Sequence, residues 1–374
     1  MIPRILTRLP VITVAKGGCL MHDYKPNPYS SRKKEARIKY LKKVLFLCLF
    51  AFLTTAMLLE NEKALVLSLT GLNLWFQKMI PTLLPFMILS GILIRMNLSD
   101  SFARLFSPLL KPLFRLSDSC IYVLVIGFLC GFPMGARVTA ESYQRGKISR
   151  REAELLLAFC NNIGPIYFTG FVFLLFPVDH PWAFLAGMYL LPLLYGLFLR
   201  YTSYRDIPKP SLAGNRLKET IQASGRLNSL HAAQTPSPAV IPPSPGRKKR
   251  PGDPSLFEEM QDSIVSSLCA IASLGGYMIL FNLLNLIPEI LLPSKMTAVQ
   301  DIIGCLLEIT SGLSRLPHSM AFWGYVILPF GGLSCIAQTY SMIRETDLSL
   351  RCYVGHKAVQ TALAFVYYTF LYAF

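Results

Sequence analysis

The sequence has few charged residues: Asp, Glu, Lys and Arg make up 16% of its 374 residues, against about one quarter in a soluble protein. Its nine cysteines form no Cys-x-x-Cys pair, which argues against structural zinc and dithiol redox sites. The phosphate-loop, Gly-x-Ser-x-Gly and His-Glu-x-x-His motifs are missing, and there are only five histidines. The sequence therefore predicts a protein that is not an enzyme and uses neither a cofactor nor a metal.

Apolar residues take the place of the missing charge. Hydrophobic residues make up 53% of the chain, and a soluble fold of this composition would expose large apolar patches to water. The length would allow two or three soluble domains, but the composition favours one membrane unit. We therefore expect an all-α, polytopic integral membrane protein with the lipid bilayer as its surroundings.

The net charge of +16 is confined to two segments. Residues 1–43 contribute +9 and residues 200–254 contribute +7, so the rest of the chain is balanced. Basic segments beside apolar spans follow the positive-inside rule, which places both in the cytoplasm. Nucleic-acid binders carry such charge on a folded face instead, so we expect no nucleic-acid partner. The Arg247–Arg250 run is expected to be a solvated linker cluster, with contact to anionic lipid as the alternative.

These features divide the chain into four parts. They are a basic cytoplasmic arm (1–43), a first membrane half (44–200), a disordered, Pro-rich, basic cytoplasmic linker (201–254) and a second membrane half (255–374). The arm shows no cleavage-site pattern, so we expect no cleaved signal peptide, and Met21 is an alternative start. The linker holds nine prolines and no hydrophobic periodicity.

Apolar runs predict the membrane crossings, and two of the runs are broken by glycine. Predicted crossings are 44–59, 79–96, 163–178, 181–199, 260–287 and 351–374, with an interfacial segment at 64–76 and an amphipathic helix at 102–116. Both basic segments lie on one side, so the number of crossings between them is even. The broken run 121–143 is therefore predicted to enter and leave on the same side, and 320–343 is the second broken run.

The two broken runs suggest an internal repeat. A shift of 200 residues aligns 131–158 with 331–358 without gaps and gives five identities. Three predicted crossings separate the windows, so the second repeat is expected to be inverted in the membrane. Paired interrupted segments in inverted halves are typical of a transporter's binding site.

The first broken run supplies the leading candidates for substrate binding: Gly131, Pro133, Gly135 and Arg137. Free N–H groups at a helix start attract anions, and an arginine fork suits a carboxylate. The alternative is a structural pair between Arg137 and Glu141, one turn further on.

Further polar residues interrupt apolar surroundings, where unpaired polar groups are costly. Asn161 and Asn162 are candidates for substrate binding, with helix capping as the alternative. The second half adds Gly331, Gly332, Ser334 and Gln338, with a polar contact between helices as the alternative. Glu308 and Thr310 are candidates for proton or ion coupling, although the sequence favours a surface acid near Arg315.

At these motifs the chain resembles the YlbJ type of sporulation integral membrane proteins, which belong with the nucleoside-recognition Gate domain proteins. The resemblance is carried by Leu84–Phe86, Gly131–Arg137, Leu157–Pro165, Leu307–Gly312 and Gly331–Ser334. Phe132 and Met134 stand where the family often has Tyr and Ser, and Arg137 stands where it often has Lys. These changes leave the substrate open but keep the charge at 137.

The resemblance implies a multi-pass protein of a spore-forming bacterium with two Gate repeats. It also implies a role in spore maturation and the cortex, and other sporulation membrane proteins as partners. Gate domains resemble halves of concentrative nucleoside transporters. The YlbJ type is linked with moving dipicolinic acid across the outer forespore membrane, which comes from the mother cell.

Three functional hypotheses remain open at this point. The first is a secondary transporter of a small anionic solute, with dipicolinate as the expected one. The second is a carrier of nucleosides or other neutral solutes, which would depend on Asn161, Asn162 and Gln338 rather than Arg137. The third is a membrane scaffold for spore-envelope assembly, which would place function in the linker.

Overall fold

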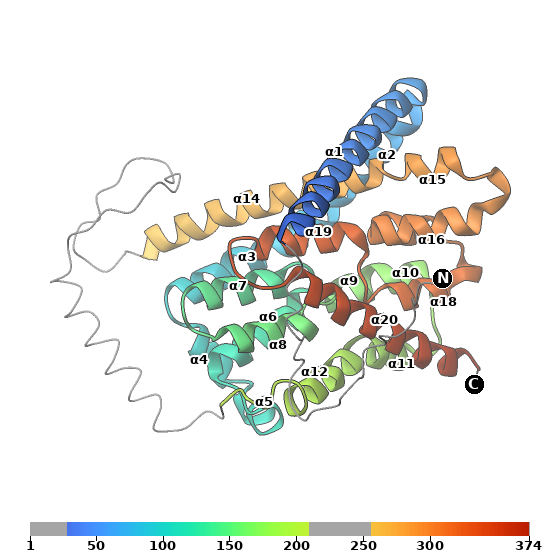
Figure 1. The fold of residues 1–374 in the computed structure, drawn as a ribbon. Coiled ribbons are helices and arrows are strands. Elements are labelled where there is room, and N and C mark those ends of the chain that lie inside the picture. Colours follow the sequence, from blue (N-terminus) through green and yellow to red (C-terminus); the bar gives the residue numbers. More distant parts are fainter. Residues whose placement is uncertain (1–27, 209–255, 374) are drawn as a thin grey trace, which may run out of the picture. The chain divides into compact units, whose positions relative to one another are not determined.

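The computed structural model describes residues 28–208 and 256–373 and is helical, with no strand in these ranges (Figure 1). The chain divides into two units between Thr55 and Ala56. The first is built from most of α1 (Pro28–Leu59). α1 includes residues 28–43, which the sequence analysis assigned to the basic arm. The Lys, Arg, Glu and Ala residues of this stretch have high helix propensity. Residues 1–27 and most of the predicted linker, including Arg247–Arg250, lie outside the described residues.

Several helices are long and apolar enough to cross a membrane, which confirms the all-α polytopic class. Within the described ranges there are five such segments: Lys39–Leu59, Asn61–Arg95, Pro181–Tyr201, Leu256–Leu291 and His318–Ile343. A sixth results if the sharply bent pair α5 (Ser107–Phe114) and α6 (Asp118–Cys130) forms one span. α20 (Leu350–Ala373) is not among the five and carries the polar residues Lys357 and Gln360.

The predicted interfacial segment 64–76 is helical and continues without a break into the next predicted crossing. α2 (Asn61–Leu74), a π-helical turn (Trp75–Met79) and α3 (Ile80–Arg95) form one helical segment. The wider turn just before α3 fits the missing N–H of Pro81. Trp75 fastens it to α14 (Leu256–Leu283), because its indole N–H donates to the carbonyl of Ile271 at 2.8 Å.

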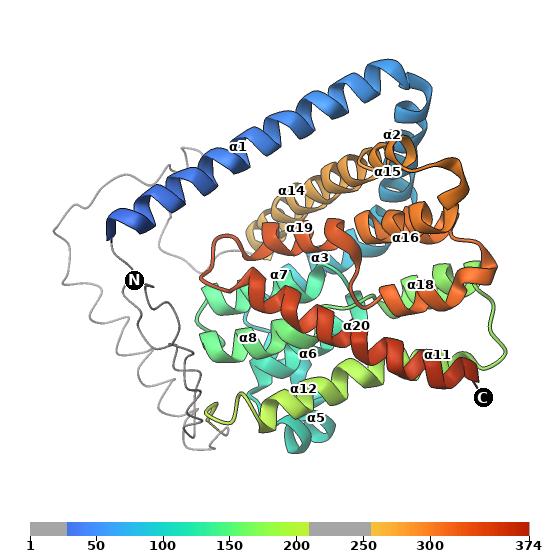
Figure 2. The ribbon, with the colours of Figure 1, turned by 45° about the vertical axis from the view of Figure 1, so that its right-hand side comes forward.

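The interior of the second unit repeats one arrangement: a helical hairpin followed by an interrupted helix (Figure 2). The hairpins are α6 with α7 (Met134–Gln144), and α16 (Thr297–Leu307) with α17 (Ile309–Arg315). The interrupted helices are α8 (Arg150–Phe159) with α9 and α10 (Pro165–Leu175), and α18 (Ala321–Ile327) with α19 (Gly332–Ile343).

Two predictions on this region need correction. Residues 163–178 do not form a full crossing, since the apolar helix Pro165–Leu175 has only 11 residues and completes α8. The ungapped shift of 200 residues pairs the first hairpin with the second interrupted helix. The order of the elements instead relates Gly131–Pro133 to Glu308, and 160–164 to 328–331. A glycine-rich break looks the same in sequence at a hairpin tip and within a helix. The inverted relation of the halves stays a prediction.

The remaining helices complete the frame around the hairpins. They are α4 (Ser99–Arg104), α11 (Pro181–Leu185) running through a π-helical turn (Ala186–Leu190) into α12 (Leu191–Tyr201), and α15 (Leu286–Leu291), with 3-10 turns at Ser294–Met296 and His318–Met320. Buried Arg200 donates to the carbonyls of Phe114, Tyr204 and Ile207. The residues just after α12 are thus part of the fold, although the predicted linker begins at 201.

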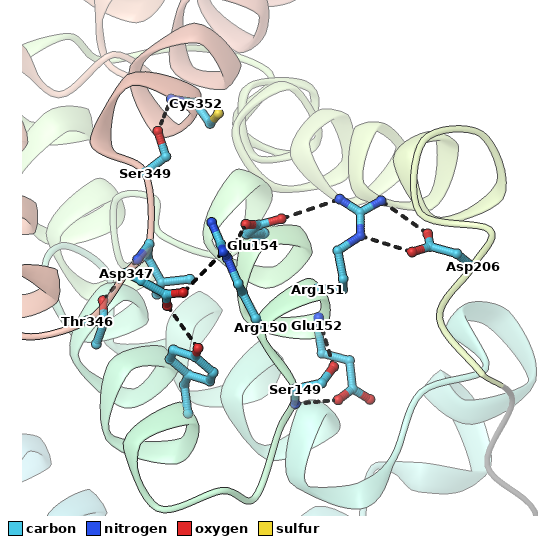
Figure 3. Close-up of polar contacts among 12 residues, drawn as sticks. Ser149, Arg150, Arg151, Glu152, Glu154, Asp206, Thr346, Asp347, Ser349 and Cys352 are labelled. Atoms are coloured by element: carbon cyan, nitrogen blue, oxygen red, sulfur yellow. Dashed lines mark hydrogen bonds and ion pairs between the residues drawn. The ribbon is translucent and has the colours of Figure 1, made fainter. Parts of the chain in front are cut away.

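A cluster of ion pairs ties the start of α8 to two other parts of the chain (Figure 3). Arg150 pairs with Asp347 in the α19–α20 connection at 3.1 Å. Arg151 pairs with Asp206, just after α12, at 3.0 Å, and its hydrogen bonds lower the pKa of that carboxyl. Ser149 and Glu152 form a capping box at the start of α8. These exposed contacts join the two halves at one end of α8, each at modest energy.

Candidate functional site: a cavity at the breaks

A cavity of about 670 Å³, counted with its open mouth, lies where the hairpins and interrupted helices meet. The two hairpins and the two interrupted helices all contribute to its wall, together with α3 and α14. The lining residues at the breaks are Leu129, Cys130, Phe132, Ile163, Gly164, Tyr167, Glu308, Ile309, Thr310, Cys335 and Gln338. Of the predicted site residues, Glu308, Thr310 and Gln338 line the cavity.

Gly131 and Gly135 allow the tip of the first hairpin to contact the backbone of the first helix break directly. Gly131 ends α6 with φ 80° and ψ −166° and lies directly against the backbone of Gly164. A Cβ on Gly135, next to the helix start at Pro133, would lie 2.7 Å from the carbonyl oxygen of Cys160. Such backbone-to-backbone contact leaves no room for a side chain. The first hairpin tip is therefore held against the first helix break.

The second half uses its glycines in the same way. A Cβ on Gly331 would lie 3.0 Å from the ring of Phe132, and one on Gly332 would lie 3.0 Å from the carbonyl oxygen of Cys305. The second helix break thus contacts the tip of the first hairpin and the body of the second. These glycines shape the cavity and do not line it.

Asn161 is fully buried and links four elements. Its Oδ1 accepts from the backbone N–H of Ala136 on α7 at 3.2 Å. Its Nδ2 donates to Thr339 Oγ1 on α19 at 3.0 Å and to Tyr353 Oη on α20 at 3.1 Å. Asn161 thus satisfies a free N–H in the first turn of α7, so the capping alternative holds for that helix and not for its own. It fixes the first hairpin to the second interrupted helix and to α20.

Asn162 leads to a buried cation that the sequence analysis missed. Its Nδ2 donates to the carbonyl of Phe159 at 2.6 Å, and its Oδ1 accepts from Lys357 Nζ at 2.6 Å. Lys357 also donates to Gln360 Oε1 at 3.0 Å, and Gln360 donates to the carbonyl of Ala158 at 2.8 Å. Lys357 is 0% exposed. The signal was visible in the sequence, since an ionisable residue inside a span is a functional candidate by default.

The acid in the cavity wall is Glu308, at the tip of the second hairpin. Its carboxylate accepts from the backbone N–H groups of Thr310 at 3.2 Å and Ser311 at 2.8 Å. The residue is 1% exposed, so the surface-acid interpretation is wrong, and Arg315 pairs with Glu289 instead. A buried acid beside a cavity can take up a proton or stabilise a polar solute.

Other polar groups in the wall have few partners. Gln338 donates to Ser334 Oγ at 3.0 Å, one turn back on α19, so these two share a face as predicted. The buried hydroxyl of Tyr167 has no hydrogen-bond partner at bonding geometry among the described residues. An unpartnered buried hydroxyl carries a desolvation penalty, which a polar ligand would remove.

Arg137 does not line the cavity. Its Nε donates to Glu141 at 2.9 Å, and its Nη2 donates to Ser266 at 3.0 Å and Ser267 at 3.3 Å on α14. The geometry favours the structural alternative, although Nη1 is buried without a partner among the described residues. Direct binding of a solute by Arg137 stays a prediction.

We expect Arg137→Ala to lower stability without changing apparent affinity for a solute. The substitution removes bonds between α7 and α14, and hydrogen bonds to charged groups contribute about 1.5–3 kcal/mol each. Thermal unfolding of the purified protein measures the first effect, and the concentration dependence of uptake measures the second. Arg104→Ala is the control, because Arg104 is exposed on α4 and, among the described residues, donates a side-chain hydrogen bond to Ser101 alone. A raised half-saturation concentration with unchanged stability would restore Arg137 to the binding site.

Comparison with known proteins supports the resemblance seen in the motifs. The Gate family model, described as nucleoside recognition, matches residues 76–177. This segment runs from the π-helical turn before α3 to the end of the first interrupted helix, and so includes the first hairpin. The chain is also 29% identical over 350 residues to the sporulation integral membrane protein YlbJ of Bacillus subtilis (strain 168), covering 87% of this chain and 81% of the relative. The chain is therefore similar to a sporulation integral membrane protein over most of its length.

The family match covers the first half of the cavity wall. The Gate segment contains Phe132, Gly164 and Tyr167, whereas Glu308 and Gln338 lie beyond its end. A second Gate repeat over 255–374 therefore stays a prediction. No solved structure matches the chain.

Proposed function

We propose that this YlbJ-like protein is a secondary transporter of a small anionic solute, with dipicolinate as the expected one. The observation that carries the proposal is the cavity walled by two hairpin tips, the first helix break and the start of α19. Such breaks expose backbone groups only where they line a cavity inside the membrane. Its lining combines many apolar side chains with a few polar groups, as is typical of a small-molecule site.

The cavity walls fit a planar ring that carries polar groups. Phe86, Phe132, Ile163 and Met278 give an apolar lining, while Gln338 and the hydroxyl of Tyr167 give hydrogen-bonding groups. Dipicolinate is a planar aromatic dianion of this kind. In line with the family, transport is across the outer forespore membrane during spore maturation and cortex formation, with the N-terminus and linker in the cytoplasm.

A neutral, nucleoside-like solute is the second candidate. Its support is the acid Glu308 in the wall, which disfavours a bound anion as long as it is charged. The description of the matching family, nucleoside recognition, points the same way. A scaffold for envelope assembly draws no support from a cavity of this kind.

Uptake by proteoliposomes containing the purified full chain tests the proposal. Labelled dipicolinate is offered, with unlabelled uridine as the competitor. Saturable dipicolinate uptake that uridine does not inhibit is the expected result. Uridine uptake without dipicolinate uptake would favour the second candidate, and no uptake of either by folded, inserted protein would favour a scaffold.

Glu308 is the proposed coupling group, with Thr310 holding its carboxylate. A proton on Glu308 would remove the repulsion of a dianion, so proton and solute would enter together. We expect Glu308→Gln to abolish accumulation driven by a pH gradient and to retain solute exchange without a gradient. The reason is that Gln is permanently neutral and its oxygen still accepts from the helix start.

Comparing accumulation with exchange in the same vesicles measures this effect. Glu345→Gln is the matched control, since Glu345 is exposed and pairs only with Arg344 at 3.6 Å. Accumulation of wild-type size in the Glu308→Gln protein would show that another group carries the proton.

A further inference from the structure

Lys357 is a buried lysine whose hydrogen-bond acceptors in the described part of the chain are neutral amides. None of the ion pairs in ranges 28–208 and 256–373 includes it. Its two hydrogen-bond acceptors are the neutral amide oxygens of Asn162 and Gln360. An ammonium group has three donors, and burial without a counter-ion is strongly unfavourable. Such an arrangement is expected where an anionic ligand supplies the missing charge.

Lys357 lies one side chain behind the cavity wall. Its Nζ is 4.8 Å from the centre of the Phe132 ring, and Phe132 lines the cavity. Asn162, which accepts from Lys357, directly precedes the lining residues Ile163 and Gly164. The ring of Phe132 thus stands between the ammonium group and the cavity.

Phe132 is at the tip of the first hairpin, in the short break between α6 and α7. Its ring packs on Gly331 at the second helix break, where a Cβ would come within 3.0 Å of the ring carbons. It is only partly buried.

We propose that Lys357 binds a carboxylate group of the solute and that Phe132 is the shutter that covers it in the empty cavity. This inference rests on the proposed function and names the group that selects the anion. In the empty state the ammonium faces the Phe132 ring in a cation–π contact. In the occupied state it makes a charge-assisted hydrogen bond to a carboxylate, which is stronger.

A lysine at this position would favour ligands with a carboxylate over neutral ligands of the same shape. A carboxylate neutralises Lys357, whereas a carboxamide or a hydroxyl adds a hydrogen bond but leaves the charge buried. The informative pair of ligands is therefore dipicolinate and its neutral isostere, pyridine-2,6-dicarboxamide. They share the ring and the shape of the substituents and differ in charge.

The test measures the affinity of the purified full chain for both ligands by isothermal titration calorimetry. Wild type is expected to prefer dipicolinate. Lys357→Gln is expected to weaken dipicolinate about tenfold or more and to leave the dicarboxamide within about threefold, because one charged contact is lost. Lys63→Gln is the control, since Lys63 is an exposed cation beside Glu60. A purely structural role for Lys357 would lower thermal stability and weaken both ligands equally, which would overturn the proposal.

A second variant covers the case in which Lys357→Gln does not fold. Phe132→Leu keeps an apolar side chain at the tip but removes the aromatic face. We expect dipicolinate to bind more tightly by about threefold or more, with no gain for the dicarboxamide, because the empty state loses the shorter of the two cation–π contacts of Lys357 and keeps the one to Tyr353 at 5.8 Å. An equal change for both ligands would overturn the shutter. If wild type binds neither ligand, the proposed function fails; if it binds dipicolinate and both variants keep its preference, only the role of Lys357 fails.

Discussion

Gly131→Ala is expected to lower the unfolding temperature of the purified protein by about 5 °C or more and to abolish uptake. Two physical effects add up at this position. The backbone, at φ 80° and ψ −166°, lies in a region that only glycine adopts at low energy, so any side chain adds of order 1–3 kcal/mol of strain. A Cβ would also press on the backbone N of Gly164, and overpacking typically costs about 1–3 kcal/mol.

The matched control is Gly170→Ala. Gly170 lies in the helical turn after α9, has no heavy atom within 4 Å of an added Cβ and shows no positive φ. Its substitution is expected to leave stability and uptake at wild-type values. Thermal unfolding and uptake are measured on both variants. Wild-type uptake by Gly131→Ala would mean that the first hairpin tip can leave Gly164 without loss of function, contrary to the cavity described here.

The same region shows how far sequence reasoning reaches. The breaks themselves could be predicted, because glycine and proline in apolar runs are visible at Gly131–Gly135 and at Gly331. Whether the chain reverses at a break or continues could not. That choice depends on packing between helices far apart in sequence, such as α7 on α19 and α19 on the body of the second hairpin.

The candidate site was predicted in part for a similar reason. Glu308 and Gln338 could be found because polar residues in apolar runs are conspicuous, and both line the cavity. Arg137 was found by the same rule but is paired with Glu141 and with serines of α14. Lys357 was missed because it lies in the last span, outside the breaks on which the repeat argument concentrated. Spacing does not show which buried charges have partners, and this decides their role.

Asn161→Ala is the second substitution for which we expect a large effect, with uptake reduced about tenfold or more, the factor to which 1.4 kcal/mol corresponds. The truncation leaves the N–H of Ala136 and the hydroxyls of Thr339 and Tyr353 without their common partner. Each buried polar group left unsatisfied costs about 1–3 kcal/mol. A water molecule could replace some of these bonds, but it would not fix the distance between α7 and α19.

Asn73→Ala is the control, because Asn73 is an exposed asparagine on α2 and its loss should be neutral. Uptake and thermal unfolding measured together separate two functional classes. A carrier needs the first hairpin tip in register with α19 around the cavity, so it loses transport when Asn161 is truncated. A scaffold that acts through the linker would tolerate the change as long as the chain folds. Full complementation of a sporulation defect by folded Asn161→Ala protein would therefore contradict the carrier proposal, whereas loss of complementation with the fold retained would support it.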